Sequence, residues 1–103
     1  MNVKFLEPAL LEMDDAVKYY NEELAGLGGK FYREILAAIN IIKLFPDSWN
    51  RCSLNTRKAT ITTFPYSLIY ALDCETVVII AVAHHHRKPE YWIDRMIYKG
   101  ESK

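Results

Sequence analysis

The segment AVAHHHRKPEYWIDR, residues 81–95, gathers side chains that could do chemistry. Three consecutive histidines follow an apolar run, and two arginines, a lysine and a tyrosine come after them. Imidazole, guanidinium and phenol groups can move protons or stabilise developing negative charge. The segment therefore indicates a metal site, a site that acts on nucleic acid, or simply the solvent-exposed end of a buried strand.

Cleavage of RNA without a metal is the most demanding of these chemistries. It requires removal of the 2′-hydroxyl proton, stabilisation of the phosphorane and protonation of the leaving oxygen. The candidate catalytic residues are Arg57, His84, Arg87 and Tyr91. The side chain of Lys58 could also take part in this chemistry. If the last strand continues past His84, alternation puts His84 and His86 on one face and turns His85 away.

Structural roles for the same residues stay open. His84 can form hydrogen bonds at the end of a strand, and Arg57 and Arg87 can pair with carboxylates such as Glu90 or Asp94. For Arg57 and Arg87 we favour a role facing an anion or a partner protein. The expected partner-binding residues are Trp49, Arg57, Arg87, Tyr91, Trp92 and Arg95, and an exposed apolar groove is expected near the three aromatic ones.

A metal site is not expected. A strand sends adjacent histidines to opposite faces, and a closed zinc site needs ~4 converging ligands. Cys52 and Cys74 are not spaced as a CxxC pair and are expected to be reduced, partly buried thiols. The sequence predicts neither a metal nor a cofactor.

Composition limits the class of protein. The 103 residues fit one domain over residues 1–103 with an ordered core of about 3–95, and the formal net charge is zero. A neutral chain is a poor candidate for a strongly cationic nucleic-acid binder. The basic residues nevertheless outnumber the acidic ones by eight to six in residues 47–103, which also hold all three histidines. Any anion-binding surface is expected there.

No targeting or membrane segment is evident. The first residues carry charges too early for a signal peptide, and no apolar run reaches the ~20 residues of a membrane helix. The expectation is a soluble, cytoplasmic protein with no membrane partner.

Two helices are predicted in the first half. Pro8 suits the first turn of a helix whose acidic side chains, Glu12 among them, face water. Its expected apolar stripe is Leu10, Met13, Val17, Tyr20, Leu24 and Leu27. A glycine turn follows at Gly26, Gly28 and Gly29.

The second helix is predicted over residues 30–45, more buried than the first, with Pro46 stopping it. Its main stripe is Phe31, Ile35, Ala38, Ile42 and Phe45.

Strands account for the rest of the chain. Residues 2–6 predict a first strand, and residues 52–64, 66–73 and 76–84 predict an antiparallel meander whose last strand is central. Residues 89–96 predict a helical turn or a strand-like segment, and residues 98–103 a loose end. The fold class is α+β, a helical hairpin packed on a small, mostly antiparallel sheet in the order β-α-α-β-β-β.

Four stretches together resemble the RelE/ParE superfamily, the toxins of bacterial type II toxin–antitoxin (plasmid stabilisation) systems. They are GLGGKF at the helical turn, LFPDSW at the helix stop, the Arg-bearing strand that leads to FPYSLIY, and the closing AVAHHHRKPEYWIDR. The resemblance covers about Val3 to Arg95. It implies the fold above and a cognate antitoxin protein that wraps the chain and blocks its working surface.

The resemblance leaves three functions open. A ParE-like toxin would inhibit growth by binding a target such as DNA gyrase, without being an enzyme. A RelE-like toxin would be a ribosome-dependent endoribonuclease that cuts mRNA with Arg57, His84, Arg87 and Tyr91. A non-toxic member would only bind its antitoxin. The neutral charge favours the first, because ribosomal RNA selects a strongly basic surface.

Overall fold

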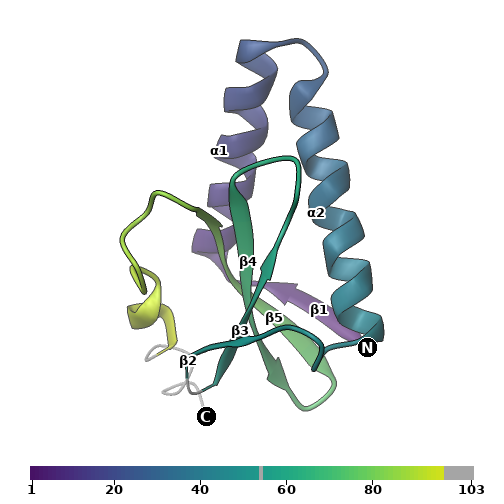
Figure 1. The fold of residues 1–103 in the computed structure, drawn as a ribbon, viewed down its shortest axis with the longest axis vertical. Helices are drawn as coiled ribbons and strands as arrows, with labels where there is room; N and C mark the ends of the chain where they lie inside the picture. The colour runs from purple at the N-terminus through teal and green to yellow at the C-terminus, as the bar shows by residue number, and fades with distance from the viewer. Residues whose placement is uncertain (54, 97–103) are drawn as a thin grey trace.

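The computed structural model describes residues 1–53 and 55–96 (Figure 1). In chain order its elements are β1 (Asn2–Phe5), α1 (Glu7–Glu23), α2 (Leu27–Leu44), β2 (Arg51–Ser53), β3 (Thr56–Thr60), β4 (Tyr66–Asp73) and β5 (Thr76–His84). A helical turn begins at Ile93, as one of the two alternatives for residues 89–96 predicted. The loose end predicted for residues 98–103 lies outside the described residues.

The strands form one mixed sheet in the order β1-β5-β4-β3-β2. β1 runs parallel to β5, and every other neighbouring pair is antiparallel. The α+β class, the meander and the central position of the last strand are therefore confirmed. The stretch predicted as one strand over residues 52–64 contains two short paired strands, β2 and β3, where the sequence predicted one.

The helical hairpin covers one face of the sheet (Figure 1). Side chains from both helices meet β3, β4 and β5 in a helix-side core that includes Phe31, Ile35, Leu68 and Tyr70. Within residues 1–53 and 55–96, no helix combines the length and the apolar character needed to cross a membrane.

The sheet has a second apolar face, and a bulge in β5 adds to it. The pairing register between β4 and β5 shifts in mid-strand and leaves Ile80 as an extra residue on β5. Ile79 and Val82 consequently belong to the helix-side core, whereas Ile80 and Ala81 both belong to a cluster on the opposite face. We call this cluster the outer cluster. The chain after β5 doubles back to cover it with Trp92, which is 3% exposed.

α1 buries small residues where larger ones were expected. Its buried positions are Ala9, Met13 and Ala16, while Leu10 is exposed. Leu24 is also exposed and lies just beyond the helix end. The predicted stripe was wrong at these two leucines and at Leu27, which begins α2. A helix packed closely on β5 and α2 places alanine at the tightest positions.

α2 is the more apolar helix and buries Phe31, Ile35, Ile39 and Ile42. It ends at Leu44, so Phe45 lies outside the helix and is 58% exposed. The expected position of Phe45 in the buried stripe was therefore wrong. The helix end agrees with the preference of a residue before proline for extended backbone.

The helical hairpin needs two glycines for different reasons. Gly26 precedes α2 with φ +90°, a left-handed conformation that glycine adopts without strain. Gly28 lies inside α2, where an added Cβ would stand 2.2 Å from the carbonyl oxygen of Val17. The amide of Gly28 also donates to Asn21 Oδ1 over 2.8 Å. Gly28 and Gly29 were predicted as part of the turn, but both belong to the helix, and Gly28 allows α1 and α2 to touch.

We predict that Gly28→Ala destabilises the protein by about 1–3 kcal/mol, because the new methyl group forces the helix backbones apart. Urea unfolding followed by circular dichroism measures this. Gly29→Ala is the matched control, since an added Cβ there meets only the end of the Arg33 side chain at 3.4 Å. Alanine at this helical position should be neutral or stabilising by up to about 1 kcal/mol. Equal losses in the two variants would contradict the close-contact explanation.

The segment after α2 is held against the sheet by two side chains. The Tyr70 hydroxyl donates to the Pro46 carbonyl over 2.7 Å. Arg57 donates to the Asp47 and Trp49 carbonyls and forms an ion pair with Asp47 at 3.4 Å. Burial raises the pKa of Tyr70 to about 12, with smaller opposing effects from Arg57 and Asp47.

The raised pKa of Tyr70 predicts a loss of stability at alkaline pH. In the unfolded chain the phenol ionises near pH 10.0, whereas the folded state holds its proton to about pH 12. The stabilisation is therefore complete below pH 10 and declines between pH 10 and 12, at up to about 1.4 kcal/mol per pH unit. The free energy of unfolding, measured from pH 8 to 11, should decline less steeply above pH 10 in Tyr70→Phe than in the wild type. Identical slopes would contradict this assignment.

Candidate functional site

The C-terminal segment closes an edge of β5 that β1 leaves open. β1 pairs with β5 only as far as Ile79, whose carbonyl accepts from the Leu6 amide as the chain turns into α1. Beyond that point two side chains replace the missing strand. The Val82 amide donates to Glu12 Oε1 over 3.0 Å, and Arg95 donates to the Ile80 carbonyl over 2.9 Å. On the edge of β5 that faces away from β4, the Val82 amide and the Ile80 carbonyl are thus paired without a further strand.

Glu12 links α1, β5 and the C-terminal segment. Its carboxylate accepts from the Tyr91 hydroxyl over 2.6 Å and from both terminal nitrogens of Arg95, at 3.0 and 2.9 Å. The Glu12 and Arg95 side chains are 17% and 19% exposed. We call the arrangement of Glu12, Tyr91, Arg95 and the Val82 amide the Glu12 clamp. Such charge-assisted, bidentate hydrogen bonds fix the relative orientation of the two side chains strongly.

Arg87 completes the surroundings of the Glu12 clamp. Its guanidinium carbon lies 3.8 Å from the centre of the Tyr91 ring, and its Nη1 is 3.9 Å from Glu12. Burial, followed by the hydrogen bond and charge of Glu12, raises the pKa of Tyr91 far above its usual value. The phenol therefore keeps its proton at neutral pH and is poorly suited to exchange it with a substrate.

The ion pairs and hydrogen bonds of the structure bear on two expectations about charged side chains. Glu12 was expected to face water, but it accepts hydrogen bonds from groups that lie 70 and more positions away in the chain. The expected pairing of Arg57 and Arg87 with carboxylates is confirmed, but the partners are Asp47 and Glu12 and not the examples Glu90 and Asp94.

The predicted aromatic groove is only partly available. Trp92 is buried in the outer cluster, so it does not line an exposed groove in the isolated chain. Tyr91 and Trp49 are half-buried. Trp49 packs against the helix-side core, and within the described residues its buried indole nitrogen has no hydrogen-bond partner.

Three of the four candidate catalytic residues, His84, Arg87 and Tyr91, line one pocket, whereas Arg57 lies apart from them. Arg57 pairs across strands with Tyr70, on the helix side of β3. Tyr91 packs on the outer cluster, with Arg87 over its ring. β4 separates β3 from β5, a spacing of roughly 10 Å between those two strands, and the two groups also lie on opposite faces.

The three histidines take different roles. The ring centre of His84 lies 5.0 Å from that of Tyr66 and 5.0 Å from that of His86. Burial, then the neighbouring histidines, lowers the pKa of His84, so its ring is held neutral. β5 ends at His84, and the following turn brings His86 beside it without a longer strand.

His85 is tied to the sheet through a buried serine. Its Nε2 lies 3.0 Å from Ser67 Oγ, which lies 3.0 Å from Thr60 Oγ1. Ser67 is 1% exposed, so this chain of contacts fixes the His85 ring and offers no accessible nucleophile.

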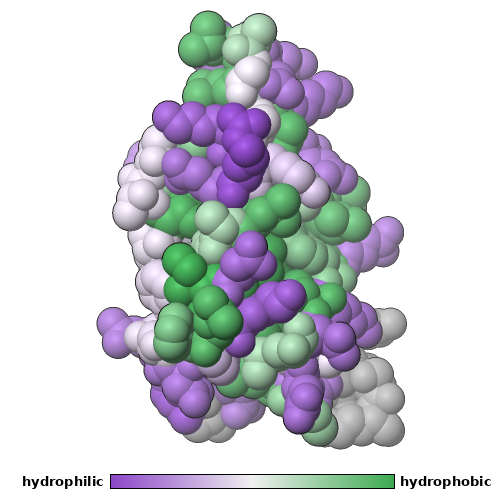
Figure 2. All heavy atoms as spheres, turned by 90° about the vertical axis from the view of Figure 1, so that its right-hand side faces the viewer, coloured by the Kyte–Doolittle hydropathy of each residue, from purple (hydrophilic) through white to green (hydrophobic). Residues whose placement is uncertain are grey.

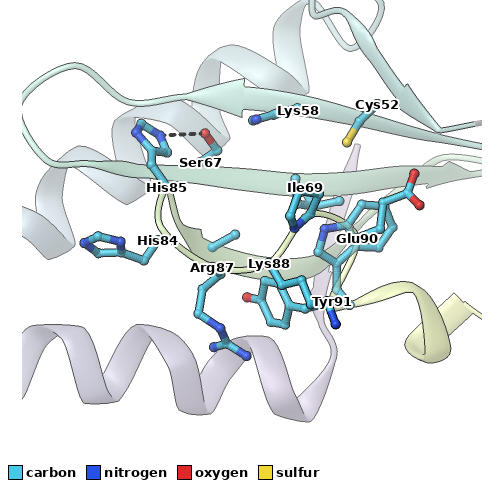
Figure 3. A pocket seen from close by; sticks show the side chains of 13 residues that line it. Cys52, Lys58, Ser67, Ile69, His84, His85, Arg87, Lys88, Glu90 and Tyr91 are labelled. Atoms are coloured by element: carbon cyan, nitrogen blue, oxygen red, sulfur yellow. Dashed lines mark hydrogen bonds between the residues drawn. The ribbon is translucent and has the colours of Figure 1, made fainter.

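A pocket of about 290 Å³ opens on the outer face of the sheet, beside the C-terminal segment (Figure 3). We call it the outer pocket. Strands β2 to β5 supply one side of it, and residues 87–92 supply the other. Its apolar lining includes Ile69, Ala83 and Trp92; its polar lining is Cys52, Lys58, Ser67, His84, His85, Arg87, Lys88, Glu90 and Tyr91. In Figure 3 the Arg87 side chain turns down toward α1, whereas Lys58 extends along β3 toward the Ser67–His85 pair.

The two cysteines differ in exposure, and neither is in a disulfide. Cys52 is a half-buried free thiol, while Cys74 is exposed in the β4–β5 turn, so the expected partial burial holds only for Cys52. Within the described parts of the chain, no three histidine, cysteine or acidic side chains are grouped so that they could hold a metal ion.

The helices carry a further exposed apolar surface. On and just after α2, large apolar side chains lie in solvent, with Leu44 71% exposed. Figure 2 shows hydrophobic patches interrupted by hydrophilic ones on the α2 side of the molecule. The exposed apolar residues of this surface are Tyr32, Leu36, Ile41, Leu44 and Phe45.

We predict that Glu12→Gln lowers the free energy of unfolding by about 2–3 kcal/mol, because the half-buried guanidinium of Arg95 loses its countercharge. Urea unfolding measures the loss, and tryptophan fluorescence should shift to longer wavelength as Trp92 meets water. Glu22→Gln, an exposed change on the same helix, should stay within about 0.5 kcal/mol of the wild type. If the two variants behave alike, Glu12 does not hold the C-terminal segment.

The comparisons with known proteins agree with this architecture. The model of one family, described as "ParE toxin of type II toxin-antitoxin system, parDE", matches residues 3–89 and so ends before Tyr91. A search of curated proteins found no match. Among solved structures, a chain of "Chromosomal ParDE TA system from P. aeruginosa" has the same fold, with a TM-score of 0.73 at 16% identity over 82% of this chain and 95% of that chain. The chain belongs to the ParE toxin family of type II toxin–antitoxin systems.

Proposed function

We propose that the chain is a cytoplasmic toxin that arrests growth by binding a protein target such as DNA gyrase and is neutralised by a cognate antitoxin. The observation that carries the proposal is the match of residues 3–89 to the ParE toxin family. The geometry adds support, because a toxin that acts by binding needs no converging catalytic groups.

An RNA-cleaving mechanism has less support from the geometry. Arg57 lies on the helix side of β3, two strands away from Arg87 and Tyr91. The Tyr91 hydroxyl donates a hydrogen bond to Glu12, and the raised pKa of Tyr91 makes this phenol a weak acid. Of the four candidates this leaves His84 and Arg87 in the pocket, and that pair lacks a second group for proton transfer.

The antitoxin is proposed to cover the exposed apolar surface of α2. An unpaired patch with side chains such as Leu44 and Phe45 is typical of a surface that a partner protein buries. Burying such side chains contributes roughly 25 cal/mol for each Å² removed from water, so this surface can anchor a tightly bound segment.

The proposal predicts a specific pattern of growth arrest. Induced expression of the full chain should stop growth and break DNA while messenger RNA stays intact. The purified chain should inhibit supercoiling by DNA gyrase, and co-expression of the neighbouring antitoxin gene should restore growth. Rapid cleavage of messages at A-site codons would support the endoribonuclease, and unimpaired growth would support a non-toxic member; either would overturn the proposal.

A variant separates binding from catalysis. His84→Ala removes the imidazole best placed for proton transfer, but a toxin that acts by binding should keep its gyrase inhibition within about 2-fold, since the loss of one side chain at a rim costs little. A loss of toxicity in a folded His84→Ala variant, with circular dichroism unchanged, would count against it.

A further inference from the structure

The outer pocket has the features of a binding site for part of another protein. Its floor is apolar, with Ile69, Ala83 and Trp92, and polar groups stand around it. A volume of about 290 Å³ is at the small end of ligand pockets and can hold one large side chain. The wall formed by residues 87–92 is fixed by the Glu12 clamp, so the pocket is preformed.

The rim of the outer pocket is cationic. Lys58 and Lys88 are both exposed, and among the described residues neither belongs to an ion pair. Glu90 is the one carboxylate in the lining. Unpaired ammonium groups around an apolar floor select carboxylates that flank an apolar group.

Glu90 marks the same rim with an uncommon backbone conformation. Its φ is 59°, in the left-handed region that a residue other than glycine seldom adopts. The adjoining Tyr91 and Trp92 are fixed in the Glu12 clamp and the outer cluster, so the surrounding contacts hold this conformation.

The pocket is less suited to a nucleobase. Single-stranded nucleic acid is usually bound by stacking bases on accessible aromatic rings. Here one face of the Tyr91 ring is covered by Arg87, Trp92 is buried, and the His85 ring is turned to Ser67. The zero net charge of the whole chain also gives little general attraction for phosphate.

We propose that the outer pocket binds an acidic segment of a partner protein, with one large apolar side chain on the floor and flanking carboxylates on Lys58 and Lys88. This inference rests on the proposed function in that the working surface binds protein. It adds the chemistry of the bound segment and a location apart from the apolar surface of α2.

A direct test uses defined peptides and the full chain. The probe is a capped pentapeptide with four glutamates around a central phenylalanine, titrated into isotopically labelled protein and followed by NMR. Shifts should cluster on residues of the outer pocket. A peptide with central alanine, and one with four lysines around phenylalanine, should each bind at least about 5-fold more weakly, since each lacks one of the two interactions.

Charge reversals locate the site. Lys58→Glu and Lys88→Glu should each weaken binding of the acidic peptide about 3- to 10-fold, as expected for exposed charges at a rim. Lys43→Glu, an equal change on exposed α2, should leave binding within about 2-fold.

Three results would overturn the proposal: shifts that map outside the outer pocket, equal binding of the alanine peptide, or tighter binding of adenosine monophosphate or inorganic phosphate in the same pocket. Growth arrest is not part of the readout. A failure here therefore leaves the toxin test standing, and a failure of the toxin test leaves peptide binding measurable.

Discussion

The carboxylate of Glu12 meets a constraint that the topology creates. β1 ends opposite Ile79, where the chain enters α1, but β5 continues to His84. A buried strand with unpaired backbone groups is costly, because each such group has lost its contact with water. Glu12, reaching from α1, and Arg95, reaching from the segment after β5, supply the missing partners.

The same carboxylate organises the surface on the other face. Arg95 and Tyr91 converge on Glu12, and between them Trp92 packs on the outer cluster. Residues 87–92 then form one wall of the outer pocket. The pairing of the β5 edge, the position of residues 87–95 and the shape of the outer pocket thus depend on one half-buried carboxylate. Its removal leaves the charge of Arg95 without compensation.

Hydrophobic periodicity was enough to predict both helices, the meander and the fold class. It failed where small residues or long-range contacts decide the structure. Alanine and glycine carry little hydrophobic signal, so the tight positions Ala9 and Gly28 were missed. The bulge at Ile80 is not visible in an uninterrupted β-branched run. The Glu12 clamp joins residues 70 to 83 positions apart, and a single sequence holds no signal that pairs them.

The arginine and lysine side chains differ in their contacts, and this difference bears on function. Arg57, Arg87 and Arg95 are all engaged within the fold, by carbonyls, carboxylates or an aromatic ring. The planar guanidinium suits such contacts, whereas the flexible, strongly hydrated ammonium of lysine suits an exposed rim. Among the described residues, Lys58 and Lys88 are exposed lysines beside the apolar floor of the outer pocket. A surface of this kind favours recognition of an acidic protein segment, because two rim charges give selectivity without the broad basic field that RNA requires.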